Sequence, residues 1–486
     1  MRQTSTARCW TRGRRVPQPL CPPRRVREPR RALLVRAHRQ CSEEVRGMNA
    51  AEPTDVPRVV VAGGGFAGVS VVQALHRRFR GAVEVVLVSP RNHMLFQPLL
   101  PEVASGAIEP RHAVAPIRQA LPRVRFRMGE LDGLDPARKT VTVQPPAGDP
   151  YELAYTHVVI ALGSAPRALL IPGLDEHAVA FSTVAEALHL RNAMLSRLEI
   201  AESTQDPDAR ESALRAVFIG GGYTGVEALA ELHYLAQRAA ERFENVEPEE
   251  IQWTLVEAAD RILPNLPLEL ADRAVVKLRR RGIDVRLGTT VERIDDGRLQ
   301  LSTGEELLAD TVVWSAGVEP HPCVRRLGLD LDDAGRVEVD RTMRVPDHAN
   351  VWALGDCAAV PRPDGGSYPP TAEQATRQGK QLGSNLARVL QGRAPEAYAH
   401  GESAELVTLG SHTAMGTVAG RQLVGKLPWL ARRAYYVAQM PSVSRRVRLA
   451  LEWSLGTAFP NDPTQLDALE RPGGPLHRSL MRAESR

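Results

Sequence analysis

Cysteine is scarce in this sequence, which has five cysteines among 486 residues. They stand at positions 9, 21, 41, 323 and 357, and no two of them form a Cys-x-x-Cys pair. This spacing argues against a disulfide framework, a thiol redox centre and a cysteine zinc site. We therefore expect inert thiols and no bound metal.

Long apolar segments are also missing. No stretch of about 20 apolar residues occurs, so we expect no helix that spans a bilayer. Apolar residues make up 43% of the chain and charged residues 24%. This composition is typical of a soluble globular protein, and the length allows two or three domains with proper cores.

The positive net charge of +5 is concentrated at the N-terminus. Residues 1–47 hold 13 Arg and 3 Glu but no Lys or Asp, so they carry +10 and the rest of the chain sums to −5. We therefore expect no basic surface for nucleic acid on the folded part of the chain.

Residues 1–57 form a Pro- and Arg-rich extension without helical or strand periodicity. Three interpretations are open: translation that starts at Met48, which we favour, a disordered basic arm, and an Arg-rich organelle transit peptide. Glu28, Glu43, Glu44 and the scarcity of serine argue against the transit peptide.

From Arg58 the pattern changes to that of an α/β fold. A first unit shows strand, glycine-rich turn, helix and strand in order, over residues 58–62, 63–68, 69–79 and 83–88. The same order returns over residues 216–219, 220–225, a helix through Leu229 and Leu232, and 253–256. These patterns predict two βαβ units. Further strands are expected at residues 158–161, 311–314 and 351–354.

Both glycine-rich turns match G-x-G-x-x-G, the first at Gly63, Gly65 and Gly68 and the second at Gly220, Gly222 and Gly225. In this motif the first glycine makes the tight turn and the second lets the backbone approach a pyrophosphate. The third lets helix and strand pack closely. One match is weak, but two matches between a strand and a helix predict two dinucleotide sites, each with a pyrophosphate at a helix N-terminus.

The residue that ends the second strand of each unit bears on nucleotide choice. Glu257 follows the strand 253–256, where a carboxylate accepts the ribose hydroxyls and repels a 2′-phosphate, so NADH is favoured over NADPH. Nearby Arg261 could instead attract a 2′-phosphate, and a solvated strand-end charge is the other interpretation of Glu257. In the first unit Ser89 takes this place, followed closely by Arg91. Ser89 could bind the ribose, and Arg91 could stack on adenine or meet a phosphate. The alternative is that both are ordinary turn residues.

Longer motifs then identify a family. Residues 58–400 resemble the two-dinucleotide flavoprotein oxidoreductases, and more narrowly the type II NADH dehydrogenases (NADH:quinone oxidoreductases). The resemblance rests on the segments 63–68 (GGGFAG), 89–106 (SPRNHMLFQPLLPEVASG), 161–164 (ALGS), 220–227 (GGGYTGVE), 314–318 (WSAGV), 353–358 (ALGDCA) and 369–379 (PPTAEQATRQG).

The resemblance implies a role for each motif. The first glycine motif would hold FAD and the second NADH, with Phe96, Gln97 and Pro98 near the flavin. Asp356 would bind the ribityl chain, a helix cap or turn being the alternative. Glu227 would lie close to the nicotinamide and flavin, a first-turn carboxylate favoured by the helix dipole being its alternative. Further cofactor contacts are expected at Phe66, Ala67, Ala161, Gly163, Tyr223, Thr224, Gly317, Gly355 and Ala372.

One departure puts the electron acceptor in doubt. The family usually carries two glutamines, four residues apart, where this chain has Glu373 and Arg377. These residues are expected on the acceptor side of the flavin, where they could pair with each other and where Arg377 could donate to a quinone carbonyl. With Glu227 they are our candidates for catalytic residues.

The C-terminal region suggests a membrane surface. After Pro441 a helical pattern places Val443, Val447, Leu451 and Leu455 on one face, with Arg445, Arg446 and Arg448 elsewhere. Apolar and basic residues in this arrangement are typical of a helix lying on a membrane. A packing helix or a homodimer helix is the alternative. The family resemblance extends to this region and to the segment 459–462.

These observations predict an α/β fold with two Rossmann-like domains, the second inserted in the first, and a C-terminal region of amphipathic helices. The domain boundaries are 1–57, 58–165, 166–310, 311–400 and 401–486. We expect an FAD-dependent enzyme that passes hydride from NADH to FAD and electrons to a quinone, without proton pumping. It would be peripheral, on the cytoplasmic side of a membrane. The alternatives are a soluble NADH-dependent flavin oxidoreductase with a protein or small-molecule acceptor, and a non-enzymatic NADH-sensing flavoprotein.

Overall fold

A computed structural model describes residues 56–465, except residues 80, 168, 401–404, 411, 419, 457, 458 and 460–462. The expectations for residues 1–55, and most of those for the segment 459–462, therefore lie outside the described residues. Within the described part, no helix is both long and apolar enough to cross a membrane.

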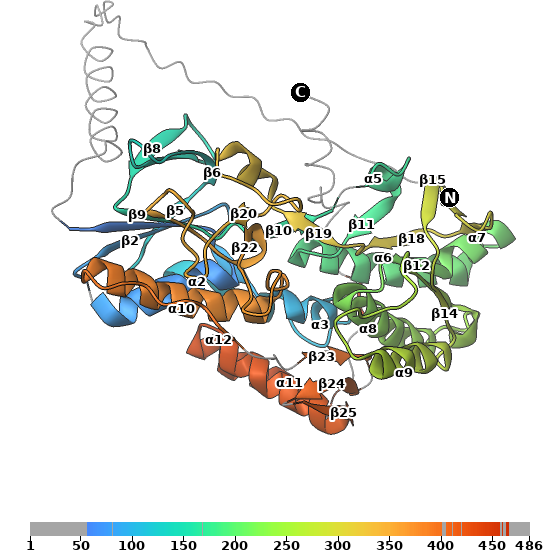
Figure 1. Ribbon diagram of the computed structural model, residues 1–486. Coiled ribbons are helices and arrows are strands. Elements are labelled where there is room, and N and C mark those ends of the chain that lie inside the picture. The colour runs from blue at the N-terminus through green and yellow to red at the C-terminus, as the bar shows by residue number, and fades with distance from the viewer. Residues whose placement is uncertain are drawn as a thin grey trace, which may run out of the picture. The chain divides into compact units, whose positions relative to one another are not determined.

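Two five-stranded parallel sheets form the framework (Figure 1). The first has the order β21 (Val351–Ala353), β9 (His157–Ile160), β1 (Arg58–Ala62), β2 (Glu84–Ser89) and β5 (Arg125–Met128). The second has the order β11 (Ala178–Ala180), β18 (Thr311–Trp314), β12 (Arg215–Ile219), β13 (Gln252–Val256) and β14 (Ile283–Arg286). The chain leaves the first sheet after β9 and returns at β21, so the second sheet is inserted in the first, as expected.

The β18 strand corrects one expected boundary. The boundary near residue 310 assigns residues 311–314 to the first domain, but β18 pairs with β11 and β12 in the second sheet. The second sheet therefore ends after Trp314. The apolar sequence of residues 311–314 does not indicate which of the two sheets the strand joins.

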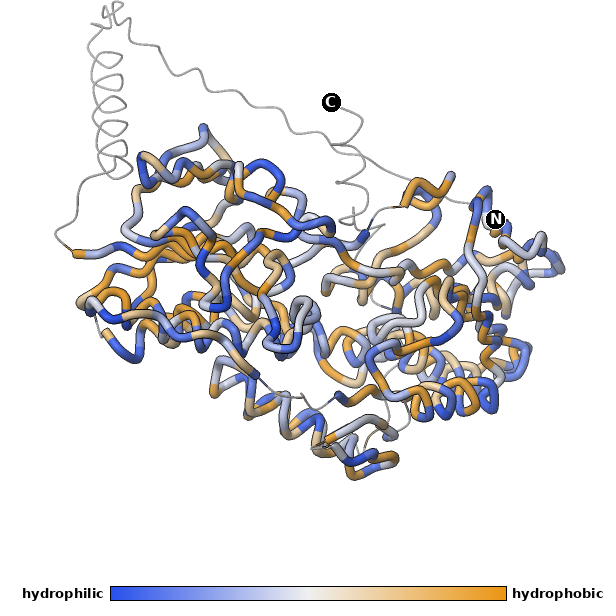
Figure 2. The backbone as a smooth tube through the Cα atoms, viewed as in Figure 1, coloured by the Kyte–Doolittle hydropathy of each residue, from blue (hydrophilic) through white to orange (hydrophobic). Residues whose placement is uncertain are grey.

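Helices cover the two sheets. In the first domain α2 (Phe66–Phe79) packs extensively against α10 (Ala372–Leu390), and α3 (Leu100–Ala104) and α4 (Ile117–Ala120) are short. The second domain contributes α5 (Leu174–His177), α6 (Val184–Ser203), α7 (Pro207–Ala213), α8 (Tyr223–Ala240) and α9 (Leu268–Arg279). In Figure 2 the strands of the two sheets are largely hydrophobic, and the helices beside them are of mixed character. The strands β1 and β9 are buried almost throughout, because parallel strands covered on both faces are apolar along their length.

Three small antiparallel sheets extend the framework. They consist of β6 to β8 (Glu130–Asp135, Thr140–Gln144, Tyr151–Ala154), β15 to β17 (Val291–Asp295, Arg298–Leu301, Glu306–Leu308) and β23 to β25 (Glu405–Thr408, Ala414–Val418, Arg421–Gly425). Three two-stranded pairs complete the set: β3 (His93–Leu95) with β4 (Val114–Pro116), β10 (Ser164–Pro166) with β19 (Val318–Pro320), and β20 (Val337–Glu338) with β22 (Ala358–Ala359). The C-terminal region is thus not purely helical, since β23 to β25 precede its helices.

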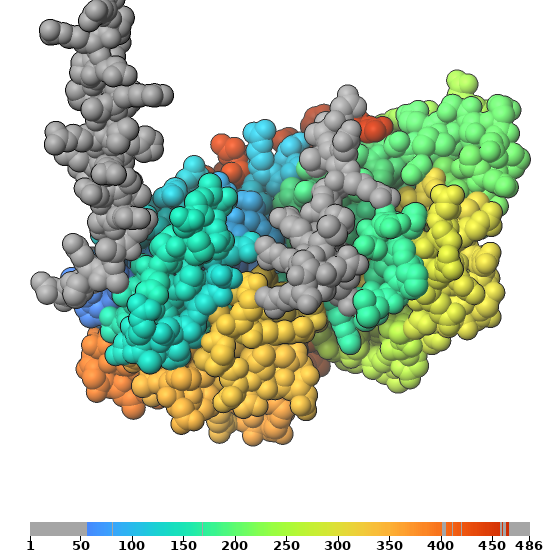
Figure 3. Space-filling model, turned by 90° about the horizontal axis from the view of Figure 1, so that it is seen from above, coloured from blue at the N-terminus to red at the C-terminus, as the bar shows by residue number. Residues whose placement is uncertain are grey.

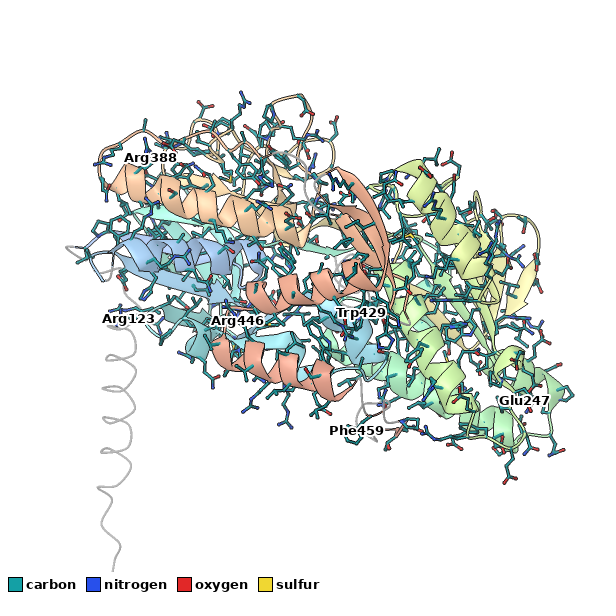
Figure 4. All side chains as sticks on the ribbon, turned by 90° about the horizontal axis from the view of Figure 1, so that it is seen from below. Arg123, Glu247, Arg388, Trp429, Arg446 and Phe459 are labelled. Atoms are coloured by element: carbon teal, nitrogen blue, oxygen red, sulfur yellow. The ribbon has the colours of Figure 1, made fainter. Side chains whose placement is uncertain are left out.

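Two C-terminal helices, α11 (Lys426–Gln439) and α12 (Val443–Leu455), follow β25. Figure 4 shows both in full, on the same face as α10 and α2. On the opposite face, seen in Figure 3, the red of the C-terminal residues appears only at the edge. The two helices therefore belong to one face of the described structure.

Candidate functional site

The first glycine turn lies where β1 passes into α2. Gly63 has a φ of +120°, and a Cβ there would lie 2.0 Å from the carbonyl oxygen of Ala161, which follows β9. A Cβ at Gly68 would lie 1.9 Å from the carbonyl oxygen of Gly63. A Cβ at Gly65 would meet nothing within 4 Å. The first and third glycines are thus required by the backbone, whereas the second faces open space.

The second turn, between β12 and α8, repeats this geometry. Gly220 has a φ of +112°, and a Cβ there would lie 2.6 Å from the backbone of Ser315, which follows β18. A Cβ at Gly225 would lie 2.1 Å from the carbonyl oxygen of Gly220, and one at Gly222 would meet nothing within 4 Å. Ser315, which was not predicted from the sequence, also donates its hydroxyl to the carbonyl oxygens of Ile219 and Gly220.

Both turns lie at equivalent points of their sheets. β1 is flanked by β2 and β9, and β12 by β13 and β18, so each glycine turn follows the strand at which the strand order reverses. Ligands of open α/β sheets bind at this point, outside the carboxyl ends of the strands. The open space beside Gly65 and Gly222 therefore fits the pyrophosphates of two dinucleotides.

The strand-end residues differ between the two sites. The Glu257 carboxylate accepts hydrogen bonds from the Gly221 N–H at 2.5 Å and the Ala259 N–H at 2.8 Å, so it is fixed beside the second turn. Arg261 instead donates to the carbonyl oxygens of Leu263 and Leu266. In the first site Ser89 is buried and accepts from the Arg91 N–H at 3.4 Å, while Arg91 itself is exposed.

Asp356 lies in the short turn after β21, beside the first site. The Asp356 carboxylate accepts a hydrogen bond from the Ser164 hydroxyl at 2.8 Å, and burial raises the pKa of Asp356. Gly355 has a φ of +74° and donates its N–H to the Gln378 side chain of α10 at 2.8 Å. The turn that carries Asp356 is thus held by β10 and α10, and a Cβ at Gly355 would lie 3.3 Å from the Ala67 side chain near the start of α2. Ser164 and Gln378 were not predicted from the sequence.

An aromatic group adjoins the start of α2. Phe96 is buried and packs edge-on against Phe66, with ring centres 5.0 Å apart, and against Tyr436 of α11 at 5.3 Å. Gln97 and Pro98 open the 3₁₀ turn η1 (Gln97–Leu99), where Gln97 is exposed and Pro98 is half-buried. The segment expected near the flavin therefore does lie beside the first glycine turn.

Glu227 is the most unusual of the expected residues, because its side chain is 7% exposed and carries an ionisable group. Its carboxylate accepts from Arg432 of α11 at 2.8 Å and from the Thr408 N–H of β23 at 2.8 Å. Burial raises the pKa of Glu227, against the opposing effects of Arg432 and Thr408. Burial acts to lower the pKa of Arg432, but Glu227, Tyr436 and Glu102 together outweigh burial and the pKa is raised. Neither partner was found from the sequence, because Arg432 is 205 residues away.

A second buried carboxylate, Glu102 of α3, also reaches the C-terminal helices. It accepts from Arg433 of α11 at 3.3 Å and from the Trp453 indole of α12 at 2.5 Å. The Arg433 guanidinium lies 3.7 Å from the ring centre of Trp429 and 4.7 Å from that of Trp453. Figure 4 labels Trp429, at the end of α11 that enters this cluster. Glu102, Arg433 and both tryptophan contacts were not predicted from the sequence.

The two residues that depart from the family pattern do pair with each other. Glu373 and Arg377, in the first half of α10, form an ion pair with N–O distances of 2.7–2.8 Å. The Glu373 side chain is 16% exposed and that of Arg377 is 42% exposed. Burial raises the pKa of Tyr435 of α11, and the charges of Glu373 and Arg377 act on this pKa in opposite directions. The predicted pairing is confirmed, and the place of the pair on the acceptor side of the flavin stays a prediction.

The remaining expected contacts lie around the same turns. Ala161 follows β9, and Gly163 and Gly317 have φ values of +70° and +90°, where a Cβ would meet nothing within 4 Å. Ala372 opens α10, whose cap is the Thr371 hydroxyl. Ala67 is the second residue of α2, and a Cβ at Gly355 would lie 3.3 Å from its side chain. Tyr223 and exposed Thr224 open α8, and the Tyr223 hydroxyl donates to Glu405 at 3.3 Å.

Comparisons with known proteins agree with this geometry. The sequence profile of the family described as pyridine nucleotide-disulphide oxidoreductase matches residues 57–379. The chain is 30% identical over 455 residues to an internal alternative NAD(P)H-ubiquinone oxidoreductase A1 of Arabidopsis thaliana, covering 86% of this chain and 88% of the relative. It is 29% identical over 427 residues to the type II NADH:quinone oxidoreductase Ndh of Mycobacterium tuberculosis, covering 83% and 89%.

A solved structure shows the same fold. NDH2 from Plasmodium falciparum in complex with NADH superposes with a TM-score of 0.78 at 17% identity, covering 84% of this chain and 99% of that one. Together with the two glycine turns, the family profile and the sequence relatives identify the group. The chain is an oxidoreductase of the pyridine nucleotide-disulphide oxidoreductase family, in its type II NADH dehydrogenase branch.

Proposed function

We propose that this chain binds FAD at the first glycine turn and NADH at the second, and passes electrons from NADH to a quinone at a membrane surface. The observation that carries the proposal is the repeated turn geometry, in which the second glycine of each motif faces open space at a strand-order reversal. The relatives named as NADH:quinone or NAD(P)H-ubiquinone oxidoreductases support the choice of substrates.

The residues of the first site fit FAD. The start of α2 offers backbone N–H groups to a pyrophosphate, and the Asp356 carboxylate, held by Ser164, can accept ribityl hydroxyls. When bound, FAD would supply the hydride acceptor and the two-electron donor that the protein's own side chains lack. Phe66, Phe96 and Tyr436 would enclose the flavin end of the site, because they form one aromatic group beside the turn.

The described cysteines support direct electron transfer from the flavin to the acceptor. Among the described residues Cys323 and Cys357 are free and buried. Burial raises the pKa of Cys357 to about 11, and burial also raises that of Cys323. Since the thiolate is the reactive form, neither residue is suited to relay electrons. The acceptor would therefore meet the flavin itself, beside the Glu373–Arg377 pair.

NADH is the preferred nucleotide in this proposal. The Glu257 carboxylate is fixed at the second turn by two N–H groups, where it would accept ribose hydroxyls and repel a 2′-phosphate. Arg261, the residue that could have attracted a 2′-phosphate, is engaged with two carbonyl oxygens instead. Both observations favour NADH over NADPH.

The outer face of α12 supports attachment to a membrane. Val443, Val447, Leu451 and Leu455 are 70%, 53%, 57% and 59% exposed, although they share one face of the helix. We call these four residues the apolar stripe. Leu427 and Leu430 of α11 add exposed apolar surface, at 80% and 54%. A lipid bilayer is the occupant that suits this stripe, because exposed Arg448 lies beside it and a quinone would be dissolved in the bilayer.

One set of measurements tests the activity. The full-length chain is purified, its flavin spectrum recorded, and NADH added with a quinone, a soluble dye or oxygen as acceptor. We expect bleaching of the flavin by NADH and the fastest turnover with quinone. Fast reduction of the dye or a protein acceptor with no turnover of quinone would favour the soluble oxidoreductase. Slow reduction without acceptor preference would favour the NADH-sensing flavoprotein.

A second experiment tests the membrane role. Val447→Ser/Leu451→Ser removes apolar surface without touching a buried residue. We expect weaker binding to vesicles and slower turnover of a long-tailed quinone in them, while dye reduction in solution is unchanged. Leu268→Ser/Val276→Ser, at exposed positions of α9 outside the stripe, is the matched control. Equal vesicle binding by both variants would show that the apolar stripe does not contact the membrane.

A further inference from the structure

A groove between α2 and α10 carries a concentration of positive charge that the proposed electron transfer does not use. Its volume is about 460 Å³, and the segment 398–400 closes its third side. The groove is lined by four cationic side chains together with Tyr398 and His400; the cations are Arg77, Arg78, Arg377 and Lys380.

Close helix packing forms the floor of this groove. A Cβ at Gly379 would lie 2.5 Å from the carbonyl oxygen of Ala67, and one at Gly383 would lie 2.5 Å from the Ala74 side chain. The two glycines therefore let α10 approach α2 along their common length. The long cationic side chains of both helices line the groove beside this contact.

The charge in the groove is largely uncompensated. Arg377 pairs with Glu373, but Arg77, Arg78 and Lys380 form no ion pair with a carboxylate of the described residues. Burial, followed by the charges of Arg377 and Arg77, lowers the pKa of Lys380. The buried Nε2 atom of His400 likewise has no hydrogen-bond partner among the described residues.

Ordinary helix stabilisation explains only part of this pattern. Arg77 and Arg78 occupy the last turn of α2, where the helix dipole favours cations. Arg377 and Lys380 lie in the first half of α10, one turn apart, where like charges destabilise a helix. A cluster that costs stability in the free protein is suited to bind an anion that neutralises it.

We propose that this groove binds the phosphate of an anionic membrane phospholipid. Guanidinium and ammonium groups are the side chains that bind phosphate most strongly. The lipid is favoured as the source because the helices that form the groove lie on the same face as α11 and α12, which carry the apolar stripe (Figure 4). The inference rests on the membrane attachment proposed above.

The position of Arg377 gives the site a consequence. Arg377 lines the groove and also pairs with Glu373. A phosphate bound to Arg77 and Lys380 would therefore hold the lipid beside the expected acceptor position. The groove would fix the depth and orientation at which the chain meets the membrane, beyond the attachment that the apolar stripe supplies.

Soluble lipid monomers provide the test. The full-length protein is titrated by calorimetry with dihexanoyl phosphatidylglycerol below its micelle concentration, and separately with dihexanoyl phosphatidylcholine and inorganic phosphate. We expect one site that prefers the anionic lipid to both other probes. Arg77→Gln/Lys380→Gln should weaken it by about tenfold or more, since two charge-assisted contacts are lost, and Lys380→Arg should retain it.

Arg242→Gln/Arg280→Gln removes the same charge at exposed positions of the second domain and should leave the site unchanged. Equal weakening by both double variants would show diffuse charge attraction and overturn the proposal. Inorganic phosphate that binds as tightly as the lipid would show a site for a free anion and would also overturn it, as would the absence of a saturable site. None of these readouts involves NADH, so their failure is distinguishable from failure of the proposed activity.

Discussion

The buried ion pair between Glu227 and Arg432 makes a quantitative prediction about the C-terminal region. Both side chains are nearly inaccessible, at 7% and 4%, and the Arg432 nitrogen lies 2.8 Å from the Glu227 oxygen. Arg432→Met would leave the carboxylate buried without its cation. Removing one partner of a buried pair typically costs about 3–5 kcal/mol, so we expect the free energy of unfolding to fall by that amount.

A double-mutant cycle separates the pair from other effects. Glu227→Gln leaves Arg432 uncompensated and should cost a similar amount, but Glu227→Gln/Arg432→Met removes both charges. The double variant should therefore be more stable than the sum of the single effects predicts, by about 2 kcal/mol or more. Arg448→Met, an exposed position on α12, is the control and should stay within about 0.5 kcal/mol of the parent.

Urea unfolding followed by tryptophan fluorescence suits this measurement. Trp429 and Trp453 both contact Arg433, the neighbour of Arg432, and so report on the C-terminal helices. A loss of less than about 1 kcal/mol for Arg432→Met, or two single effects that simply add, would contradict this prediction. Either result would mean that the pair does not hold α11 against α8.

Three further predictions concern single carboxylates. Glu257→Gln should lower the preference for NADH over NADPH in kcat/KM, because a ribose acceptor is lost and repulsion of a 2′-phosphate is relieved; unchanged values for both nucleotides would place Glu257 away from the ribose. Asp356→Ala should yield largely flavin-free protein, since a charged acceptor is worth about 1.5–3 kcal/mol; full flavin content would contradict this. Burial, with Glu102 nearby, raises the pKa of Glu231 from 4.5 to about 7. The folded state then keeps a proton that the unfolded state has lost, so stability falls as pH rises from about 4.5 to about 7, by up to about 3 kcal/mol. Glu231→Gln should remove this decline, measured as the difference in Tm between pH 5 and pH 8, and an unchanged difference would argue against it.

The glycine turns could be predicted because their cause is local. At Gly63 and Gly220 the backbone needs a positive φ, and at Gly68 and Gly225 a Cβ would strike the turn itself. These two requirements act within six residues, so they appear directly in the sequence, whereas the close approach of Ala161 to Gly63 and of Ser315 to Gly220 is long-range. The strand 311–314 was also found, but its sheet was not, because pairing with β11 and β12 is a long-range choice.

Other elements carry no clear local pattern. The helix α6 buries Arg191 and Asn192 as well as Leu190 and Met194, so polar residues occupy positions where a one-sided helix would be apolar. The small sheets β6 to β8 and β15 to β17 consist of strands of three to six residues, too short for alternation to stand out. Sequence periodicity is informative only where one face of an element is consistently apolar.

The partners of the buried carboxylates could not be predicted for a different reason. Glu102 and Glu227 lie within recognisable motifs. Their partners are distant in the sequence, because Arg433 lies 331 residues beyond Glu102 and Arg432 lies 205 residues beyond Glu227. Nothing in a basic, aromatic helix distinguishes residues that enter the interior from residues that face a membrane. Both kinds occur in this region, since α11 buries Arg432 and α12 exposes its apolar stripe.

This division within the C-terminal region leads to a last prediction. A region that only attached the protein to a membrane could be deleted without loss of dye reduction in solution. Deleting residues 426–486 would instead leave the carboxylates of Glu102 and Glu227 without the arginines that compensate them. We therefore expect the truncated chain to lose stability and to lose dye reduction as well as quinone turnover. Val447→Ser/Leu451→Ser, which leaves these ion pairs intact, should lose only the turnover in vesicles. A stable truncated chain with full dye activity would show that α11 serves attachment alone, and that its buried arginines are not needed to hold the fold together.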